Sequence, residues 1–234
     1  MLKKILIALA VLIAAFLGYA ATRPDTYAVE RSAEIAAPIT IVFDQLDDFR
    51  SFAEWSPWDK LDPSMQKTFE GPQSGVGASY TWQGNDEVGK GRMTIVESQP
   101  PSAIEYKLEF IEPFTAEAQT KFEVTPQGAD AARVRWQMAG KNNFMSKVFG
   151  VFMDMDTAIG KDFEKGLASL EAQSEAEAKK AVEADAAAQA ARLKTEAEAA
   201  AQAAATGTGA AAAPPPTPAD PAPANADPAG KKRP

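Results

Sequence analysis

The apolar positions between residues 143 and 170 recur at steps of three or four, the period of one face of an α-helix. Lysine and aspartate side chains occupy the opposite face, so the pattern predicts one long amphipathic helix. At about 1.5 Å per residue it would run roughly 40 Å, enough to lie across a small sheet. Its glycines would weaken it unless tertiary packing holds it. The predicted buried face is Phe144, Val148, Phe152, Met155, Ile159, Phe163, Leu167 and Leu170.

Alternating apolar and polar residues predict strands ahead of this helix. The clearest is 103–112, where Ile104, Tyr106, Leu108 and Phe110 share one face. Residues 39–49 instead have a short helical pattern. Short turns between strands imply antiparallel neighbours, so we expect an α+β fold in which a curved antiparallel sheet of about seven strands wraps on the long helix. The predicted strands are 26–35, 67–70, 78–83, 88–98, 103–112, 116–125 and 131–140.

The N-terminus has a different pattern: Lys3 and Lys4 precede an apolar run that reaches Ala21. About seventeen apolar residues is the short limit for crossing a bilayer and also fits the core of a secretory signal. The length favours an uncleaved transmembrane helix; the alternative is secretion after cleavage near Gly18-Tyr19-Ala20. Because flanking lysines stay in the cytoplasm, we expect a single-pass protein of the bacterial inner membrane with its domain facing the periplasm or outside.

Composition then divides the chain into four parts. Residues 1–24 are the membrane anchor or signal segment, and 25–173 are one globular domain. Residues 174–205, rich in Ala, Glu and Lys, favour helix but have little to bury, so we expect a helical extension. Residues 206–234, rich in Pro and Ala, cannot meet the entropy cost of folding and should form a disordered tail. An envelope protein is a candidate partner for that tail.

Charge and residue usage exclude several kinds of chemistry. The formal net charge is -8 and no basic stripe is present, so we expect no nucleic-acid partner. The chain has neither Cys nor His, which excludes disulfides, Cys/His zinc sites and Cys or His nucleophile–base pairs. We therefore expect no metal and no cofactor, and the spacing of the remaining ionisable residues singles out no catalytic residue. Asp156 and Asp162, which flank the buried face of the long helix, are expected to be solvated or at a rim.

Four stretches carry a resemblance to a known family. They are Ile35-Ala36-Ala37-Pro38 leading into 42–46, Glu54-Trp55-Ser56-Pro57-Trp58, the glycine-containing loop 71–77 followed by Tyr80 and Trp82, and 159–167 of the long helix. Residues 26 to about 172 resemble the polyketide cyclase/dehydrase and lipid-transport branch of the START-like (Bet v 1-like, SRPBCC) superfamily. The resemblance implies a helix-grip fold. The superfamily includes lipid carriers, hormone receptors, cyclases and chaperone activators, so the fold does not define the activity.

A sheet that grips a helix leaves a wedge wherever their side chains do not interdigitate, and a hydrophobic ligand would bind there. Trp55 and Trp58 are predicted either to form the rim of this pocket or to fasten the short helices to the sheet. The alternative for the other residues is ordinary core. The predicted pocket-lining residues are Tyr80, Trp82, Met93, Tyr106, Phe110, Phe122, Trp136, Met138, Phe152 and Met155.

Three functions fit these observations. The first is a membrane-tethered module that binds a hydrophobic or lipid-like small molecule without changing it. The second is an enzyme of cyclase or dehydratase type in the same cavity, which would require a polar residue buried among the aromatics with a partner placed to tune it. The third is a periplasmic interaction module with no ligand, which predicts a filled core.

Overall fold

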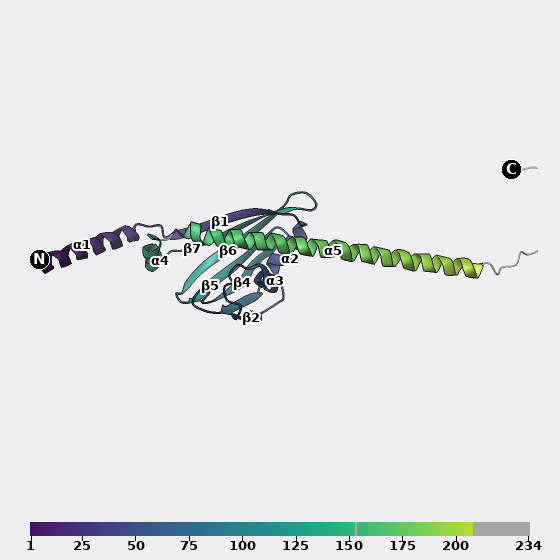
Figure 1. Cartoon of the computed structure of the whole chain (residues 1–234), viewed down its shortest axis with the longest axis horizontal. Coiled ribbons are helices and arrows are strands. Elements are labelled where there is room, and N and C mark those ends of the chain that lie inside the picture. The colour runs from purple at the N-terminus through teal and green to yellow at the C-terminus, as the bar shows by residue number, and fades with distance from the viewer. Residues whose placement is uncertain (153, 208–234) are drawn as a thin grey trace, which may run out of the picture. The chain divides into compact units, whose positions relative to one another are not determined.

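The computed structural model describes residues 1–152 and 154–207, and Figure 1 shows the order of the elements. An apolar N-terminal helix precedes two short helices, a run of strands and a long C-terminal helix. The elements are α1 (Leu2–Ala21), β1 (Thr26–Ile35), α2 (Ile39–Asp47), α3 (Phe49–Trp55), β2 (Gln66–Glu70), β3 (Ser79–Gln83), β4 (Lys90–Gln99), β5 (Ala103–Glu112), β6 (Ala116–Pro126), β7 (Ala132–Lys141), α4 (Phe144–Phe149) and α5 (Met155–Gly207).

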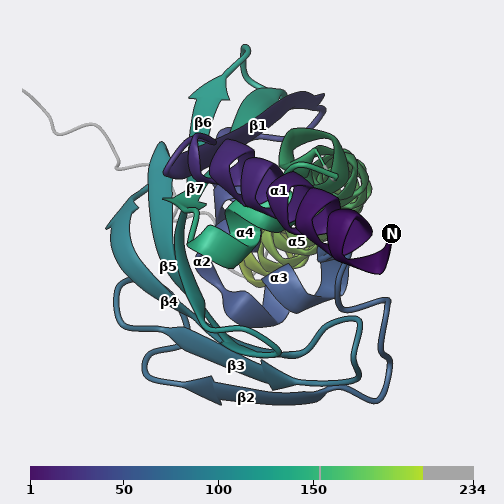
Figure 2. The same cartoon turned by 90° about the vertical axis from the view of Figure 1, so that its left-hand side faces the viewer.

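The predicted α+β fold is confirmed. The seven strands form one antiparallel sheet in the order β1-β7-β6-β5-β4-β3-β2, so every sheet neighbour is a sequence neighbour except for β1 beside β7. Figure 2 shows the sheet curving around α2, α3 and α5. Apart from Ala20, the buried hydrophobic residues of the described chain all lie between Val29 and Leu170. One core therefore holds the sheet and the gripping helix together.

The N-terminal helix α1 stands apart from this core. Within the described residues it alone is long and apolar enough to cross a membrane, with a mean hydropathy of 2.3. A signal sequence would meet the same criterion. At the other end of the chain, α5 continues through the Ala/Glu/Lys-rich stretch to Gly207, and the chain divides into two units after Ala184. The predicted disordered tail lies outside the described residues from position 208 onward.

The prediction of a single helix from residue 143 was wrong, because two helices occupy this stretch. Asn143 caps α4 by accepting a hydrogen bond from the Ser146 N–H, and the helix ends at Phe149, with Gly150 as its C-cap. Asp154 then starts α5, accepting hydrogen bonds from the Asp156 N–H and the Thr157 hydroxyl. Apolar residues at helical spacing occur on both sides of the break, which hides it in the sequence. Phe144 and Phe152, predicted to be buried, are 49% and 79% exposed.

Two glycines of α5 allow other side chains to lie directly on the helix. The Trp136 indole stacks on Phe163 with ring centroids 3.9 Å apart, and a Cβ on Gly166 would lie 2.7 Å from its Cζ3 atom. A Cβ on Gly160 would lie 1.9 Å from a guanidinium nitrogen of Arg31. The glycines that weaken the helix in isolation therefore permit its close contact with the sheet.

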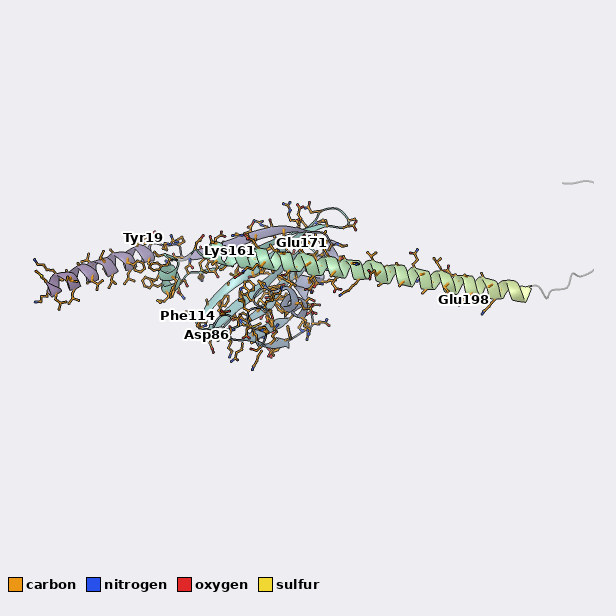
Figure 3. All side chains as sticks on the ribbon, viewed as in Figure 1. Tyr19, Asp86, Phe114, Lys161, Glu171 and Glu198 are labelled. Carbon is orange, nitrogen blue, oxygen red and sulfur yellow. The ribbon has the colours of Figure 1, made fainter. Side chains whose placement is uncertain are left out.

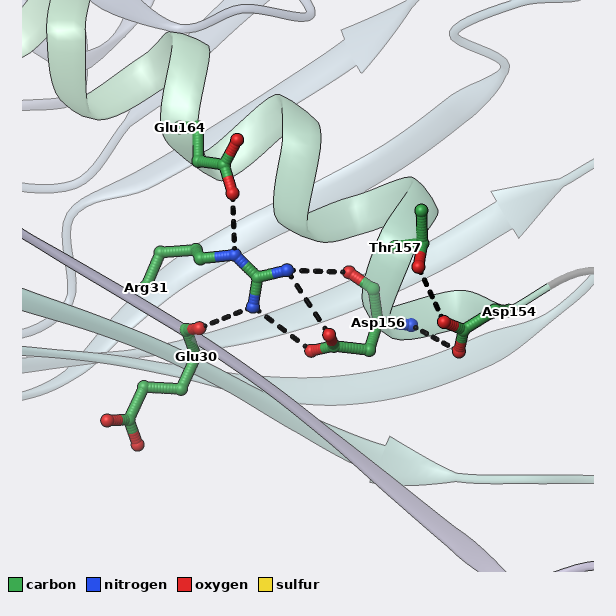
Figure 4. A network of polar contacts seen from close by, with 6 residues as sticks. All are labelled: Glu30, Arg31, Asp154, Asp156, Thr157 and Glu164. Carbon is green, nitrogen blue, oxygen red and sulfur yellow. Dashed lines mark hydrogen bonds and ion pairs between the residues drawn. The ribbon is translucent and has the colours of Figure 1, made fainter.

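Arg31 fastens the start of α5 to β1 (Figure 4). Its Nε donates to Glu164 Oε1 at 2.9 Å, and its terminal nitrogens donate to both carboxylate oxygens of Asp156, at 3.1 and 3.2 Å, and to the Asp156 carbonyl at 3.1 Å. Arg31 also donates to the carbonyl of Glu30 at 2.7 Å. Asp156 is therefore occupied by an ion pair. This contact sets the first turns of α5, and with them Ile159 and Phe163, over the sheet.

Candidate functional site

A cavity of about 270 Å³ lies between the sheet and α5. Seven of the residues predicted to line a pocket do border it, and Trp58, predicted for the rim, borders it as well. These are Tyr80, Trp82, Met93, Tyr106, Phe110, Trp136 and Met138. Further apolar lining comes from Phe52, Met65, Val88, Leu108, Ile159 and Phe163. Carbon and sulfur atoms therefore dominate the wall, as in sites for small apolar ligands.

Strand geometry explains why these residues meet. Side chains two apart on a strand face the same side, so Tyr106, Leu108 and Phe110 of β5 all point to the concave face. In the register, Leu108 lies opposite Met93 of β4, and Tyr106 lies opposite Thr120 of β6. The sheet side of the cavity wall thus contains directly paired residues on neighbouring strands.

Four predicted residues lie outside the cavity lining. Phe122 is fully buried and packs on Trp136, with ring centroids 4.9 Å apart. Trp55 is also buried, and its indole N–H donates to the Gln45 carbonyl at 3.1 Å, so it fastens α3 to α2. Phe152 is exposed and packs on Phe16 of α1, and Met155 borders a separate hollow beside Arg23 and Asp156. Trp58, by contrast, sits edge-on to Trp136 at 5.8 Å.

The cavity wall also contains a polar cluster that the sequence pattern did not predict. The Tyr80 hydroxyl donates to Asp59 Oδ1 at 3.1 Å, and Lys67 forms an ion pair with the same carboxylate, whose side chain is only 6% exposed. Burial, and then the charge of Asp59, raise the pKa of Tyr80 far above its ordinary value. The phenol therefore stays protonated and acts as a donor. Asp59 lies in a loop with no periodic pattern, and the sequence offered no signal for it.

Asp62 holds this loop in place. It accepts hydrogen bonds from the Ser64 hydroxyl at 2.6 Å, the Ser64 N–H at 3.0 Å and the Asn85 N–H at 2.8 Å. These hydrogen bonds, led by that of Ser64, hold the pKa of Asp62 below its ordinary value. Because Asn85 belongs to the β3–β4 turn, the contact joins two segments of the cavity wall.

Most polar atoms of the aromatic lining residues face the protein. The Tyr106 hydroxyl donates to the Leu46 carbonyl, and burial raises its pKa well above the ordinary value. The Trp82 indole N–H donates to the Val88 carbonyl at 3.0 Å. Ser56 Oγ and Trp136 Nε1 are buried without a hydrogen-bond partner in the described part of the chain. The aromatic residues thus offer their rings to the cavity.

Comparison with known proteins gives the family. The family model described as polyketide cyclase / dehydrase and lipid transport matches residues 26–175, more than half of the chain. The chain belongs to this family. Together with the fold, this confirms the resemblance predicted from the sequence.

The chain is also similar to solved structures at low sequence identity. An aromatase/cyclase from Streptomyces sp. R1128 is 13% identical, with a TM-score of 0.48, covering 64% of this chain and 94% of its own. A Chromobacterium violaceum protein is 16% identical (TM-score 0.47; 65% and 99% covered), and a Thermobifida fusca protein is 21% identical (TM-score 0.47; 63% and 92% covered). No match was found among curated proteins.

The cavity of this polyketide cyclase/dehydrase and lipid-transport domain has an identifiable mouth. The lining residues whose side chains keep solvent exposure are Trp58, Glu87, Val88, Phe110, Ile159 and Asp162. They come from the loop after α3, the β3–β4 turn, the end of β5 and the first turns of α5. Asp162, expected at a rim, lies at this mouth and is paired with Lys165 at 3.0 Å.

Proposed function

We propose that this domain binds a hydrophobic or lipid-like small molecule in the cavity and that α1 tethers it to a bacterial inner membrane, with the domain on the periplasmic side. The observation that carries the proposal is the apolar cavity itself. Its volume of about 270 Å³ lies near the lower end of the roughly 300–1,000 Å³ found for small-molecule sites. Each Å² of apolar ligand surface removed from water would contribute about 25 cal/mol.

The state of the polar groups supports binding without chemical change. Asp59 is already occupied by Lys67 and Tyr80, and the Tyr106 hydroxyl is occupied by a backbone carbonyl. The ligand would therefore be held chiefly by apolar and aromatic contact. A hydroxyl or carbonyl oxygen on the ligand would also give Ser56 Oγ the partner it lacks.

A second candidate function is an enzyme of cyclase or dehydratase type. The observation in its favour is the Tyr80–Asp59–Lys67 cluster, a polar group buried among the pocket aromatics with a charged partner. A protonated Tyr80 would donate a hydrogen bond to a substrate carbonyl, and Asp59 would accept a proton. In a carrier, Tyr80→Phe would leave bound ligand chemically unchanged, as it is in the parent protein. In an enzyme, the parent protein would convert its ligand and Tyr80→Phe would accumulate the unconverted one.

A cavity between sheet and helix argues against the third candidate, an interaction module with no ligand, because that module requires a filled core. The tail that such a module would use lies mainly outside the described residues.

Uptake of a neutral apolar probe tests the proposal. N-phenyl-1-naphthylamine fluoresces on entering an apolar site. It would be added to residues 25–184, which contain the whole hydrophobic core between the sheet and α5. Leu108→Trp places extra ring volume in the cavity and should reduce the saturating fluorescence several-fold. Ile104→Leu, on the same strand but outside the lining, is the matched control and should bind like the parent. Near-UV circular dichroism checks that both variants fold. Equal probe uptake by the folded Leu108→Trp variant would refute binding in this cavity.

A further inference from the structure

The cavity lies toward one end of the sheet. On β6 it is lined by Thr120 but not by Val124, and on β7 by Met138 but not by Val134. Because neighbouring strands are antiparallel, the first residues of β6 and the last residues of β7 lie at the same end of the strands. The word edge below means this rim of the sheet, where strands begin and end, and not an outer strand. The mouth of the cavity opens between segments of this same edge, which also carries the β3–β4 turn and the β5–β6 connection.

The N-terminal helix enters the domain at this edge. Thr26, the first residue of β1, pairs with Lys141 at the end of β7. Four residues, 22–25, separate α1 from β1, and fully extended they reach only about 14 Å. If α1 spans a membrane, the edge with the cavity mouth must therefore lie close to the lipid surface.

Exposed aromatic side chains gather at the same edge. Every exposed phenylalanine in the described residues lies there: Phe114 on the β5–β6 connection, with 65% exposure, and Phe144, Phe149 and Phe152 on α4 and the segment after it. Figure 3 shows Phe114 at the end of the sheet where Asp86 marks the β3–β4 turn. Large apolar residues exposed elsewhere in the domain, such as Val76, are aliphatic. Aromatic rings are the side chains enriched at membrane–water interfaces.

Contacts with α1 place part of this aromatic group at membrane depth. The rings of Phe152 and Phe16 have centroids 5.4 Å apart, and Arg23 donates to the Gly150 carbonyl at 3.1 Å. Phe16 lies five residues before the end of α1, which corresponds to about 7.5 Å along the helix axis. Interfacial apolar groups insert by about 5–10 Å, so Phe152 lies where an inserted side chain would lie.

From these positions we infer that the edge of the domain bearing Phe114 and α4 inserts into the lipid surface beside α1, so that the cavity mouth opens onto the bilayer. The occupant of this exposed aromatic surface is a lipid bilayer. A hydrophobic ligand would then pass from the leaflet to the cavity without crossing water. The docking rests on the membrane tether of the proposed function, and the passage of a ligand rests also on its cavity.

The absence of cysteine makes the test direct, because each introduced cysteine can be labelled alone. Full-length Phe114→Cys carries an environment-sensitive nitrobenzoxadiazole label and is reconstituted into phosphatidylcholine vesicles. Phe114 is the informative position because it is distant in sequence from the anchor. The matched control is Val76→Cys, which is similarly exposed at 59% and lies in the loop before β3, at the opposite edge of the sheet.

The inference predicts a blue-shifted label at position 114 that is quenched several-fold more than the label at 76 by a nitroxide on lipid acyl chains. A label at 114 that stays as water-exposed as the one at 76 refutes the docking. So does a shielded label that lipid nitroxides fail to quench, because a second copy of the chain then covers the surface. Analysis of the lipid bound to the protein separates docking from ligand binding. An inserted label with an empty cavity supports docking and rejects ligand binding. A water-exposed label with a filled cavity rejects docking and supports ligand binding.

Discussion

Replacing Gly166 by alanine tests whether the Trp136 stack determines how α5 lies on the sheet. At an exposed helix position this change would stabilise the fold by up to about 1 kcal/mol. Here the new Cβ would lie 2.7 Å from Trp136 Cζ3 and 3.2 Å from Pro57 Cδ. The indole cannot move aside easily, because it lies between Phe163 and Phe122. Overpacking costs about 1–3 kcal/mol and a disturbed aromatic pair about 0.5–1.5 kcal/mol. We expect a net loss of about 1–2 kcal/mol.

Urea unfolding of residues 25–184, followed by tryptophan fluorescence and far-UV circular dichroism, measures this loss. With an m-value of about 2 kcal/mol/M, the midpoint should fall by about 0.5–1 M without a change in slope. Gly160→Ala is the matched control, because its new Cβ meets the end of the flexible Arg31 side chain, which can swing away. Its helix gain and its weakened exposed ion pairs should nearly cancel. A Gly166→Ala variant more stable than the parent would contradict the reasoning.

Two further substitutions examine the polar groups of the wall. Tyr80→Phe removes the hydrogen bond to Asp59 and should lower the free energy of unfolding by about 1 kcal/mol. Urea unfolding at neutral pH measures this loss. An unchanged midpoint would show that the hydrogen bond does not stabilise the fold. The pKa of Asp62 is lower in the folded state than in the unfolded state. Its carboxylate therefore stabilises the fold above the unfolded-state pKa, and this stabilisation is lost as pH falls through the folded-state pKa. The parent should therefore lose more stability than Asp62→Asn between about pH 6 and pH 3; parallel losses would contradict this assignment.

The sequence predicted the strands well because their two faces differ in polarity. Strands 26–35 and 103–112 were predicted with the bounds that β1 and β5 have. The break between α4 and α5 was missed because apolar residues at helical spacing lie on both sides of it. The capping pair Asp154 and Thr157 was the available signal. Helical spacing therefore indicates which residues share a face, while caps decide where a helix begins.

The cavity was predicted only in part, for a related reason. Alternation shows that Thr120 and Phe122 of β6 face the same side, but not how far along the strand the space extends. Phe122 therefore fills the core, while Thr120 borders the cavity. Asp59 was missed because its role depends on Tyr80 and Lys67, which reach it from two different strands. Such a cluster depends on tertiary contacts that a residue pattern does not contain.

Native mass spectrometry shows directly whether the cavity holds a hydrophobic molecule. Residues 25–184, exported into a bacterial envelope and purified without detergent, would be measured intact and after solvent extraction. The parent protein and the Ile104→Leu control should carry a stoichiometric lipid-like adduct, and the folded Leu108→Trp variant should lack it. A parent protein that has a bare mass and takes up nothing from an envelope lipid extract would rule out a lipid ligand in this cavity.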